Sequence, residues 1–156
     1  MQKIVPFLWF DGKAEEAANF YTAIFDDARI TDVARYGEAG PGPKGAIMYA
    51  TFELAGQQFI ALNGGSMFHF TPAISLFVNC DTQAEIDEFW TKLSDGGRTM
   101  QCGWLTDKFG VTWQIVPKIL LPMQQDKDPA KSKRVMEAMM KMVKLDIALL
   151  QQAYDG

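Results

Sequence analysis

The sequence predicts an α+β fold in which two tandem βαβββ units form a curved mixed sheet around a cleft, followed by a C-terminal helix. Three observations lead to this class. The order of strand and helix patterns in residues 1–65 returns in residues 72–118, paired residues match at fixed shifts, and residues 128–154 show helical spacing. At 156 residues, the chain has the length of a single domain, 1–156, with its own core.

The first unit is predicted from alternating and helical periodicity in its apolar residues. Four strands and one helix are expected, with an exposed Gly- and Pro-rich loop at residues 37–43. The expected strands are Lys3–Phe10, Arg29–Tyr36, Ile47–Leu54 and Gln58–Leu62, and the expected helix runs from Ala14 to Phe25.

The second unit follows the glycine-containing loop Asn63–Phe70 and shows the same order of elements. Its last two strands are joined by a turn that ends at Gly110, and Pro117 closes the final strand. The expected elements are the strand Ala73–Asn79, the helix Thr82–Leu93 and the strands Cys102–Leu105 and Val111–Val116.

Residue matches support a duplication. A shift of 69 positions places nine residues of the first unit on identical or similar residues of the second, Leu8 on Phe77 among them. A shift of 54 near the ends of the units places Ile60 on Gln114. We interpret the two halves as repeats, each with a sheet that wraps one helix and leaves its other face concave, so that two concave faces form the cleft.

Residues 128–154 predict one long helix, with Asp128 as its N-cap and Pro129 at its first position. Its apolar stripe is broad and rich in methionine, which favours a packing or dimer face over a cofactor site. A homodimer is therefore expected. The stripe consists of Val135, Met136, Met139, Met140, Met142, Val143, Ile147, Leu149 and Leu150.

Composition narrows the function class. The chain is 48% hydrophobic and 22% charged, with a formal net charge of −4 and scattered basic residues, which argues against nucleic acid as a partner. Its two cysteines show no disulfide or metal-binding spacing, which indicates a reducing compartment. The apolar run near the N-terminus is too short to span a membrane. We expect a cytoplasmic protein without a membrane partner.

One polar residue interrupts the apolar strand Val111–Val116. Strand alternation places Gln114 on the face opposite Trp113, so Trp113 packs on a helix and the amide faces the cleft. There, Leu8 and Ile60 are expected as apolar neighbours that offer no hydrogen bonds. Since a buried amide needs partners, we expect Gln114 to bind a small organic ligand or the waters that stand in for it.

Several segments resemble one family over essentially the whole chain. They are FLWFDGKAEEAANFYTAIF, ALNGG, CGWLTDKFGVTWQIVP and the tail DPAKSKRVMEAMMKMVKLDIALL. Together they resemble the PhnB-like branch of the vicinal oxygen chelate superfamily, which includes glyoxalase I, bleomycin-resistance proteins and extradiol dioxygenases. That branch commonly carries the label 3-demethylubiquinone-9 3-methyltransferase. The sequence does not predict methyl transfer, because it has no Gly-rich strand-to-helix turn of the nucleotide-binding type.

The resemblance also bears on metal binding, because metal-dependent members of the superfamily carry His, Gln or Glu ligands on four strands. A metal-binding Glu stands at the position that Gln114 occupies here. Of the matching positions, only Gln114 has a side chain suited to a metal, so no metal and no cofactor are expected. The positions are Ile4 or Pro6, Ile60, Ala73 or Ser75, and Gln114.

Four other residues are candidates for the cleft, each with a plainer alternative. His69, the sole histidine, is either an acid, base or gate, or a surface residue of its loop. Cys102 is either a nucleophile or a structural thiol. Trp104 either stacks on a planar ligand or packs in the core, and Asn63 begins either a ligand-contacting glycine loop or a plain turn.

The prediction is metal-independent binding of a small organic molecule in the cleft between the units, as in proteins of the bleomycin-resistance kind. The alternative is an enzyme of glyoxalase or dioxygenase type that acts on a small metabolite, with Gln114, His69 or Cys102 as its polar residues. The fold alone does not decide between them, since the same architecture supports several chemistries.

Overall fold

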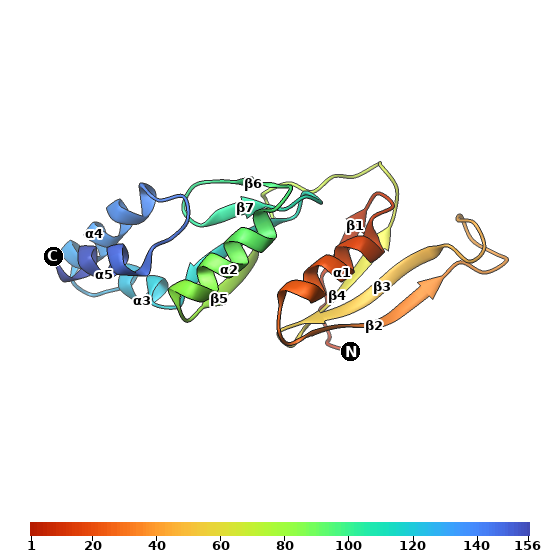
Figure 1. Ribbon diagram of the computed structural model, residues 1–156, viewed down its shortest axis with the longest axis horizontal. Helices are drawn as coiled ribbons and strands as arrows, with labels where there is room; N and C mark the ends of the chain where they lie inside the picture. The colour runs from red at the N-terminus through yellow and green to blue at the C-terminus, as the bar shows by residue number, and fades with distance from the viewer. The chain divides into compact units, whose positions relative to one another are not determined.

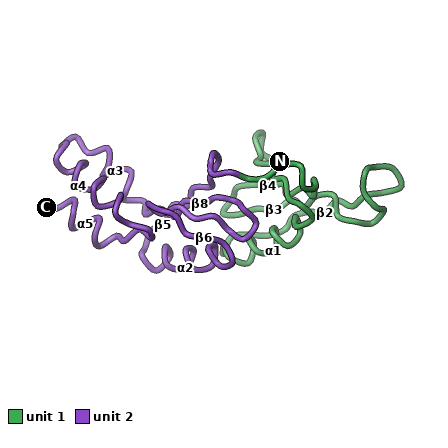
Figure 2. Tube along the Cα trace, turned by 90° about the horizontal axis from the view of Figure 1, so that it is seen from above, with its two compact units in different colours: residues 1–70 green, residues 71–156 purple.

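A computed structural model of the protein describes residues 1–156. The chain divides into two compact units, Met1–Phe70 and Thr71–Gly156 (Figure 2). Each unit contains one βαβββ repeat with its own four-stranded mixed sheet (Figure 1). The α+β class with tandem repeats, predicted from the sequence, is confirmed.

The sheet of the first unit has the order β1-β4-β3-β2, with β1 parallel to β4 and the other pairs antiparallel. The strand expected from Lys3 begins at Phe7. Pro6 has no N–H to donate to the ladder, and only its carbonyl pairs with the Ile60 N–H. The elements are β1 (Phe7–Phe10), α1 (Ala14–Ile24), β2 (Ala28–Arg35), β3 (Ile47–Leu54) and β4 (Gln57–Asn63).

Helix α1 covers one face of this sheet (Figure 1). Its buried side is rich in alanine, which allows a close approach to the strands. Below it, the rings of Phe52 and Phe59 stack at 5.3 Å, and Tyr21 lies 6.0 Å from Phe52. The opposite face carries no helix of this unit, and Phe7 is 56% exposed there.

The sheet of the second unit has the order β5-β8-β7-β6, with β5 parallel to β8. Thr82 caps α2 by accepting from the Glu85 N–H, while the Glu85 carboxylate accepts from the N–H of Asp81, the residue before the cap, in an arrangement close to a capping box. The two-residue strand β6 was not among the strands expected from the sequence. The elements are β5 (Leu76–Cys80), α2 (Gln83–Ser94), β6 (Arg98–Thr99), β7 (Trp104–Thr106) and β8 (Thr112–Pro117).

The C-terminal residues form α3 (Leu120–Gln124), α4 (Pro129–Met140) and α5 (Ile147–Asp155). The single helix expected over residues 128–154 is thus two helices joined by Lys141–Asp146. The helix stops there because the Met142 and Val143 carbonyls accept from the Cys102 and Gly103 N–H groups, and Asp146 caps a new helix. Their core consists of Val116, Leu120, Met123, Val135, Leu145 and Leu150.

The register of the sheets corrects one detail of the repeat. Phe7 lies opposite Ile60 in the first unit, and Phe77 lies opposite Gln114 in the second. Phe77 therefore corresponds to Phe7 and not to Leu8. The helices keep the shift of 69, from residue 14 to residue 83, but the first strands differ by 70, because the connection before α1 is one residue longer.

Candidate functional site

The face of the second sheet opposite α2 is centred on Gln114. As predicted, its neighbour Trp113 is buried on the helix side, with 2% of its surface exposed. Gln114 lies between Phe77 on β5 and Trp104 on β7, and its Nε2 donates to the Ser75 Oγ at 2.9 Å. Phe77 is 41% exposed. The arrangement is one amide flanked by two aromatic side chains on adjacent strands.

Thr112 adds a second polar group to this face. It lies two residues before Gln114 on β8, opposite Thr106, so both threonines project to the same side as the amide. The Thr112 hydroxyl is buried and has no hydrogen-bond partner within the chain. Because buried hydroxyls are nearly always paired, such a group calls for a water molecule or a ligand.

A hollow of about 850 Å³ lies next to this face, within the second unit. Trp104 forms one wall, and the half-buried Cys102 forms another. Cys102 has a left-handed backbone with φ of 60°, uncommon for a residue with a side chain. The lining residues are Pro72, Thr99, Met100, Gln101, Cys102, Trp104 and Val143.

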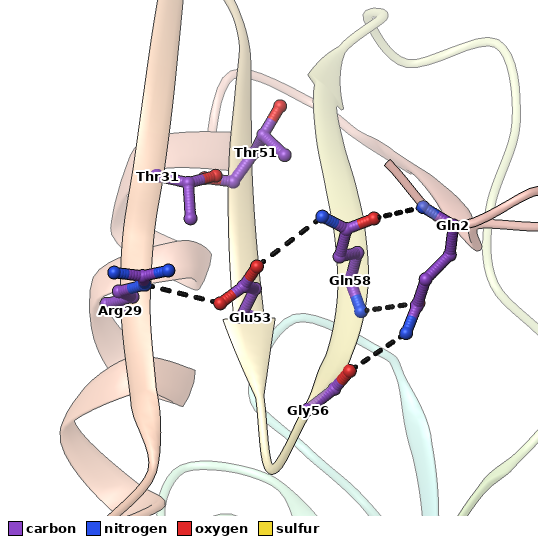
Figure 3. A network of polar contacts seen from close by, with 7 residues as sticks. All are labelled: Gln2, Arg29, Thr31, Thr51, Glu53, Gly56 and Gln58. Atoms are coloured by element: carbon purple, nitrogen blue, oxygen red, sulfur yellow. Dashed lines mark hydrogen bonds and ion pairs between the residues drawn. The ribbon is translucent and has the colours of Figure 1, made fainter.

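The equivalent face of the first unit carries a smaller hollow of about 490 Å³, with Ile60 and Phe7 in its lining. Figure 3 shows the polar network beside it, in which the Gln58 amide bridges Glu53 and the backbone N–H of Gln2. Arg29 pairs with Glu53 at 3.2 Å. These contacts pair the side chains of Gln58, Glu53 and Arg29, whereas Ile60 offers no hydrogen bond.

Two of the candidate residues in the first unit serve its own packing. Leu8 is buried on the helix side of β1, opposite Ala61, so it lines no hollow of the opposite face. The shift of 69 pairs Leu8 with Phe77, which lies on the side of Gln114, whereas the strand register pairs Phe77 with Phe7. Asn63 accepts from the Ala14 N–H at 2.8 Å and donates to the Ile47 carbonyl at 3.2 Å, which makes it a cap of α1.

His69 is exposed in the loop after β4, and the loop is held by its aromatic neighbours. The Trp9 indole donates to the Gly65 carbonyl at 2.8 Å, and its ring meets Phe68 edge-on at 5.0 Å. Gly64 is needed at this point, because a Cβ there would lie 2.3 Å from the Trp9 ring. The glycines thus serve close packing of the loop on Trp9.

The titratable side chains form no metal site, and the buried thiol Cys80 is unreactive. No three His, Cys, Asp or Glu side chains come together as a metal site would require. Burial raises the pKa of the Cys80 thiol to about 12, and Glu85 adds to the shift. Since a thiol needs its thiolate form to attack or to bind metal, Cys80 is a structural residue.

Asp107 explains the D-x-x-G pattern before Gln114. Its buried carboxylate accepts from the N–H groups of Phe109 and Val111 and from the Trp113 indole, at 2.9, 3.1 and 2.9 Å. The carboxylate therefore organises the turn and fixes Trp113, and it does not face the Gln114 side of the sheet.

Sequence reasoning missed the contributions of Thr112, Met100 and Val143. Thr112 is detectable in principle, because it shares the alternation of Gln114 along one strand. Val143 is not, since it comes from a segment that the sequence places inside a helix. Ser75, one of the alternatives at a ligand position, is the residue that Gln114 contacts.

Comparison with known proteins places this architecture. The family described as 3-demethylubiquinone-9 3-methyltransferase matches residues 2–116. The chain belongs to this PhnB-like family. A PhnB protein from Bacillus cereus is 45% identical, with 74% of this chain and 99% of that chain covered and a TM-score of 0.68. This agrees with the resemblance to the vicinal oxygen chelate superfamily.

Two further solved structures are similar to the PhnB-like chain, and the first of them shares its fold. Protein PA1353 from Pseudomonas aeruginosa is 22% identical over 75% of this chain and 98% of that chain, with a TM-score of 0.63. A glyoxylase/bleomycin resistance protein/dioxygenase domain from Frankia sp. EAN1pec is 15% identical over 72% and 94%, with a TM-score of 0.46. No curated protein matches the chain significantly. None of its helices combines the length and apolar character that crossing a bilayer requires.

Proposed function

We propose that this PhnB-like protein binds a small organic molecule without a metal ion, on the face of the second sheet that carries Gln114. The observation that carries the proposal is the position of the amide between Phe77 and Trp104, with Ser75 as its hydrogen-bond partner. Rings on both sides offer apolar and stacking contacts, while the amide oxygen of Gln114 offers a polar one.

The family description names a methyltransferase, and methyl transfer is not the function that we propose. Nucleotide-type cofactors are commonly held by a Gly-rich turn between a parallel strand and a helix. Here the corresponding connections are Asp11–Lys13 and Asp81–Thr82, which contain one glycine between them. Neither connection offers a phosphate-binding loop.

The proposal is tested by thermal-shift screening against a broad metabolite panel, followed by affinity measurements on Gln114→Leu. The variant should bind a hit about tenfold more weakly, the equivalent of about one hydrogen bond. Its unfolding midpoint should be unchanged or slightly higher, because an amide is replaced by an apolar group of similar size. Gln151→Leu, a change at an exposed residue of α5, is the matched control and should leave affinity unchanged.

Two results contradict the proposal. If Gln114→Leu unfolds the protein, the amide is structural, and if it binds every hit as tightly as the parent chain, the ligand lies elsewhere. Catalytic turnover of a metabolite in the panel would instead support the alternative, an enzyme of glyoxalase or dioxygenase type.

Metal independence has a separate test. Elemental analysis of protein purified without chelator should find far less than one transition-metal ion per chain, because the position equivalent to Gln114 in the first unit is Ile60 and the Gln114 amide bonds a serine. A reproducible content near one Zn, Ni, Mn or Fe per chain would show that other residues provide the ligands.

We also propose that the protein forms a homodimer through the apolar residues that the C-terminal helices leave exposed. Met140 is 63% exposed and Leu149 is 51% exposed, and Met136 and Leu121 are exposed as well. Burial of such side chains against a second copy removes apolar surface from water. Light scattering at micromolar concentration should give the mass of two chains, and Met140→Glu should shift it toward one. A monomeric parent chain would contradict this.

A further inference from the structure

The C-terminal helices lie beyond the segment that matches the family, which ends at residue 116. They contribute one element to the hollow beside Trp104. We call Lys141–Asp146, the link between α4 and α5, the strap. Its residue Val143 lines the hollow and is 40% exposed. One wall of the hollow thus comes from outside the family segment.

Backbone hydrogen bonds fasten the strap to the turn before β7. The Cys102 N–H donates to the Met142 carbonyl at 2.8 Å, and the Gly103 N–H donates to the Val143 carbonyl at 2.7 Å. Both donors have positive φ, 60° and 83°, so consecutive N–H groups serve consecutive carbonyls. The unusual conformation of Cys102 therefore has a structural cause, which is the docking of the strap.

Side chains hold the far end of the strap. The Gln83 amide donates to the Leu145 carbonyl at 3.1 Å and accepts from the Ile147 N–H at 2.8 Å. Leu145 is fully buried, and a Cβ on Gly103 would lie 2.9 Å from its Cδ1. Lys144 pairs with Asp87 at 2.8 Å. The strap is thus fixed on both sides of Val143.

The lining of the hollow defines the ligand that it fits. None of its seven residues is charged. Trp104 presents an aromatic ring, Met100 and Cys102 present polarisable sulfur atoms, and Thr99 and Gln101 supply the polar side chains. Its volume of about 850 Å³ is within the range of small-molecule sites. A phosphate or carboxylate ligand has no cationic partner here.

We propose that this hollow binds a neutral planar aromatic molecule between Trp104 and Val143, and that the strap of the C-terminal extension makes the site complete. The inference deepens the proposed function, since Trp104 belongs both to the hollow and to the face of Gln114. It adds a wall and a ligand class that the amide alone does not specify.

Cys102 reports on occupancy of the hollow. The other thiol, Cys80, is fully buried with its pKa raised to about 12, so iodoacetamide should alkylate Cys102 alone in the folded chain. Nile red, a neutral planar aromatic dye, is the probe. It should bind saturably and slow alkylation of Cys102, as measured by mass spectrometry. Cys102→Ser should remove the alkylated product.

Variants locate the site. Val143→Glu places a charge in the hollow and should weaken Nile red binding about tenfold or more, since an unpaired charge opposes an apolar ligand. Met67→Glu is the control, because it makes the same kind of change at an exposed residue of the loop after β4, outside the hollow and the proposed dimer surface. Gln83→Ala, which removes the two hydrogen bonds at the far end of the strap, should also weaken binding and speed alkylation, whereas Gln151→Ala should do neither.

The inference is overturned if Nile red leaves the alkylation rate of Cys102 unchanged, or if Val143→Glu binds the dye as tightly as Met67→Glu. Gln114→Leu separates the two proposals. If Val143 variants lose Nile red while Gln114→Leu has no effect on any metabolite hit, the hollow stands and the proposed role of Gln114 fails. If Gln114→Leu weakens binding of the metabolite hits while Val143→Glu keeps Nile red, the proposed site in the hollow fails and the proposed role of Gln114 stands.

Discussion

The two repeats carry similar residues on the side of each sheet that faces a helix, and different residues on the opposite side. On the helix side, Phe59 of the first unit corresponds to Trp113 of the second, and Ala61 corresponds to Ile115, so apolar residues occupy both copies. These positions fill the space between sheet and helix, where a polar group would lose its hydrogen bonds to water. The packing of the repeat thus constrains this side.

On the opposite side, the two units have different chemistry at matching positions. Ile60 corresponds to Gln114, and Thr51 corresponds to Trp104, as the strand registers show. In the first unit the Gln58 amide donates to Glu53 (Figure 3), whereas in the second the Thr112 hydroxyl has no partner within the chain. The proposed ligand site therefore lies in the second unit, where the two sheets differ most in polar character.

The turns before β4 and β8 differ as well, and a change in the second turn has the largest expected effect on stability. The first unit uses the two-residue turn Ala55-Gly56, with φ of 47° and 84°, as a type I′ hairpin requires. The second uses the buried Asp107 carboxylate with its three donors. Asp107→Asn should destabilise the chain by about 2 to 4 kcal/mol, because the amide NH2 that replaces Oδ2 meets the Trp113 indole N–H, which loses its acceptor, while the two backbone N–H groups lose a charged one.

Urea unfolding of Asp107→Asn measures this loss, with Asp11→Asn, a change at an exposed residue, as the control. The control should stay within about 0.5 kcal/mol of the parent chain, as surface changes usually do. A stability of Asp107→Asn equal to that of the control would mean that the turn does not depend on the carboxylate.

The residues on the helix side of each sheet could be predicted from the sequence, because strands and helices repeat their apolar residues with different periods. Alternation alone placed Trp113 and Gln114 on opposite faces, and helical spacing located α1 and α2. Leu8 was placed on the wrong side of its strand in the sequence-based expectation, because a one-residue difference in a connection reverses every side chain of a strand. Such a difference is invisible in a short repeat match.

The division of the C-terminal helix was not predictable for a different reason. Apolar spacing continues through residues 141–146, so the local pattern remains helical there. The helix ends because N–H groups of Cys102 and Gly103, about forty positions earlier in the chain, take up two carbonyls of the strap. The wall that Val143 contributes to the hollow follows from this non-local contact.

The smallest expected effect concerns how each unit secures its terminal segment. The N-terminal segment is held by neutral amides, whereas near the C-terminus the Tyr154 hydroxyl donates to the Asp126 carboxylate at 2.6 Å. This hydrogen bond lowers the pKa of Asp126 below its ordinary value of 3.8, and the Asp128 N–H adds to the shift. The same bond raises the pKa of Tyr154 above its ordinary value of 10.0.

The sign of the pH effect follows from these directions. Because the pKa of Asp126 is lowered in the folded chain, the hydrogen bond contributes stability above pH 3.8, and this contribution is lost as the pH falls through the folded pKa. Because the pKa of Tyr154 is raised, the contribution is full below pH 10.0 and is lost as the pH rises through the folded pKa of the tyrosine. Tyr154→Phe should therefore be slightly less stable than the parent chain between these limits, and the gap should narrow on both sides. A gap independent of pH in thermal unfolding would assign the loss to packing.

The central claim is that the Gln114 amide contacts a ligand on the helix-free side of the second sheet. It is tested most directly by the side-chain NH2 resonance of Gln114 in a ¹⁵N-labelled sample, identified as the signal that Gln114→Leu removes. Addition of a hit from the metabolite panel should shift this resonance and the Trp104 indole signal at matching concentrations. If both signals stay fixed while other resonances titrate to saturation, the ligand binds elsewhere and the amide serves only its bond to Ser75.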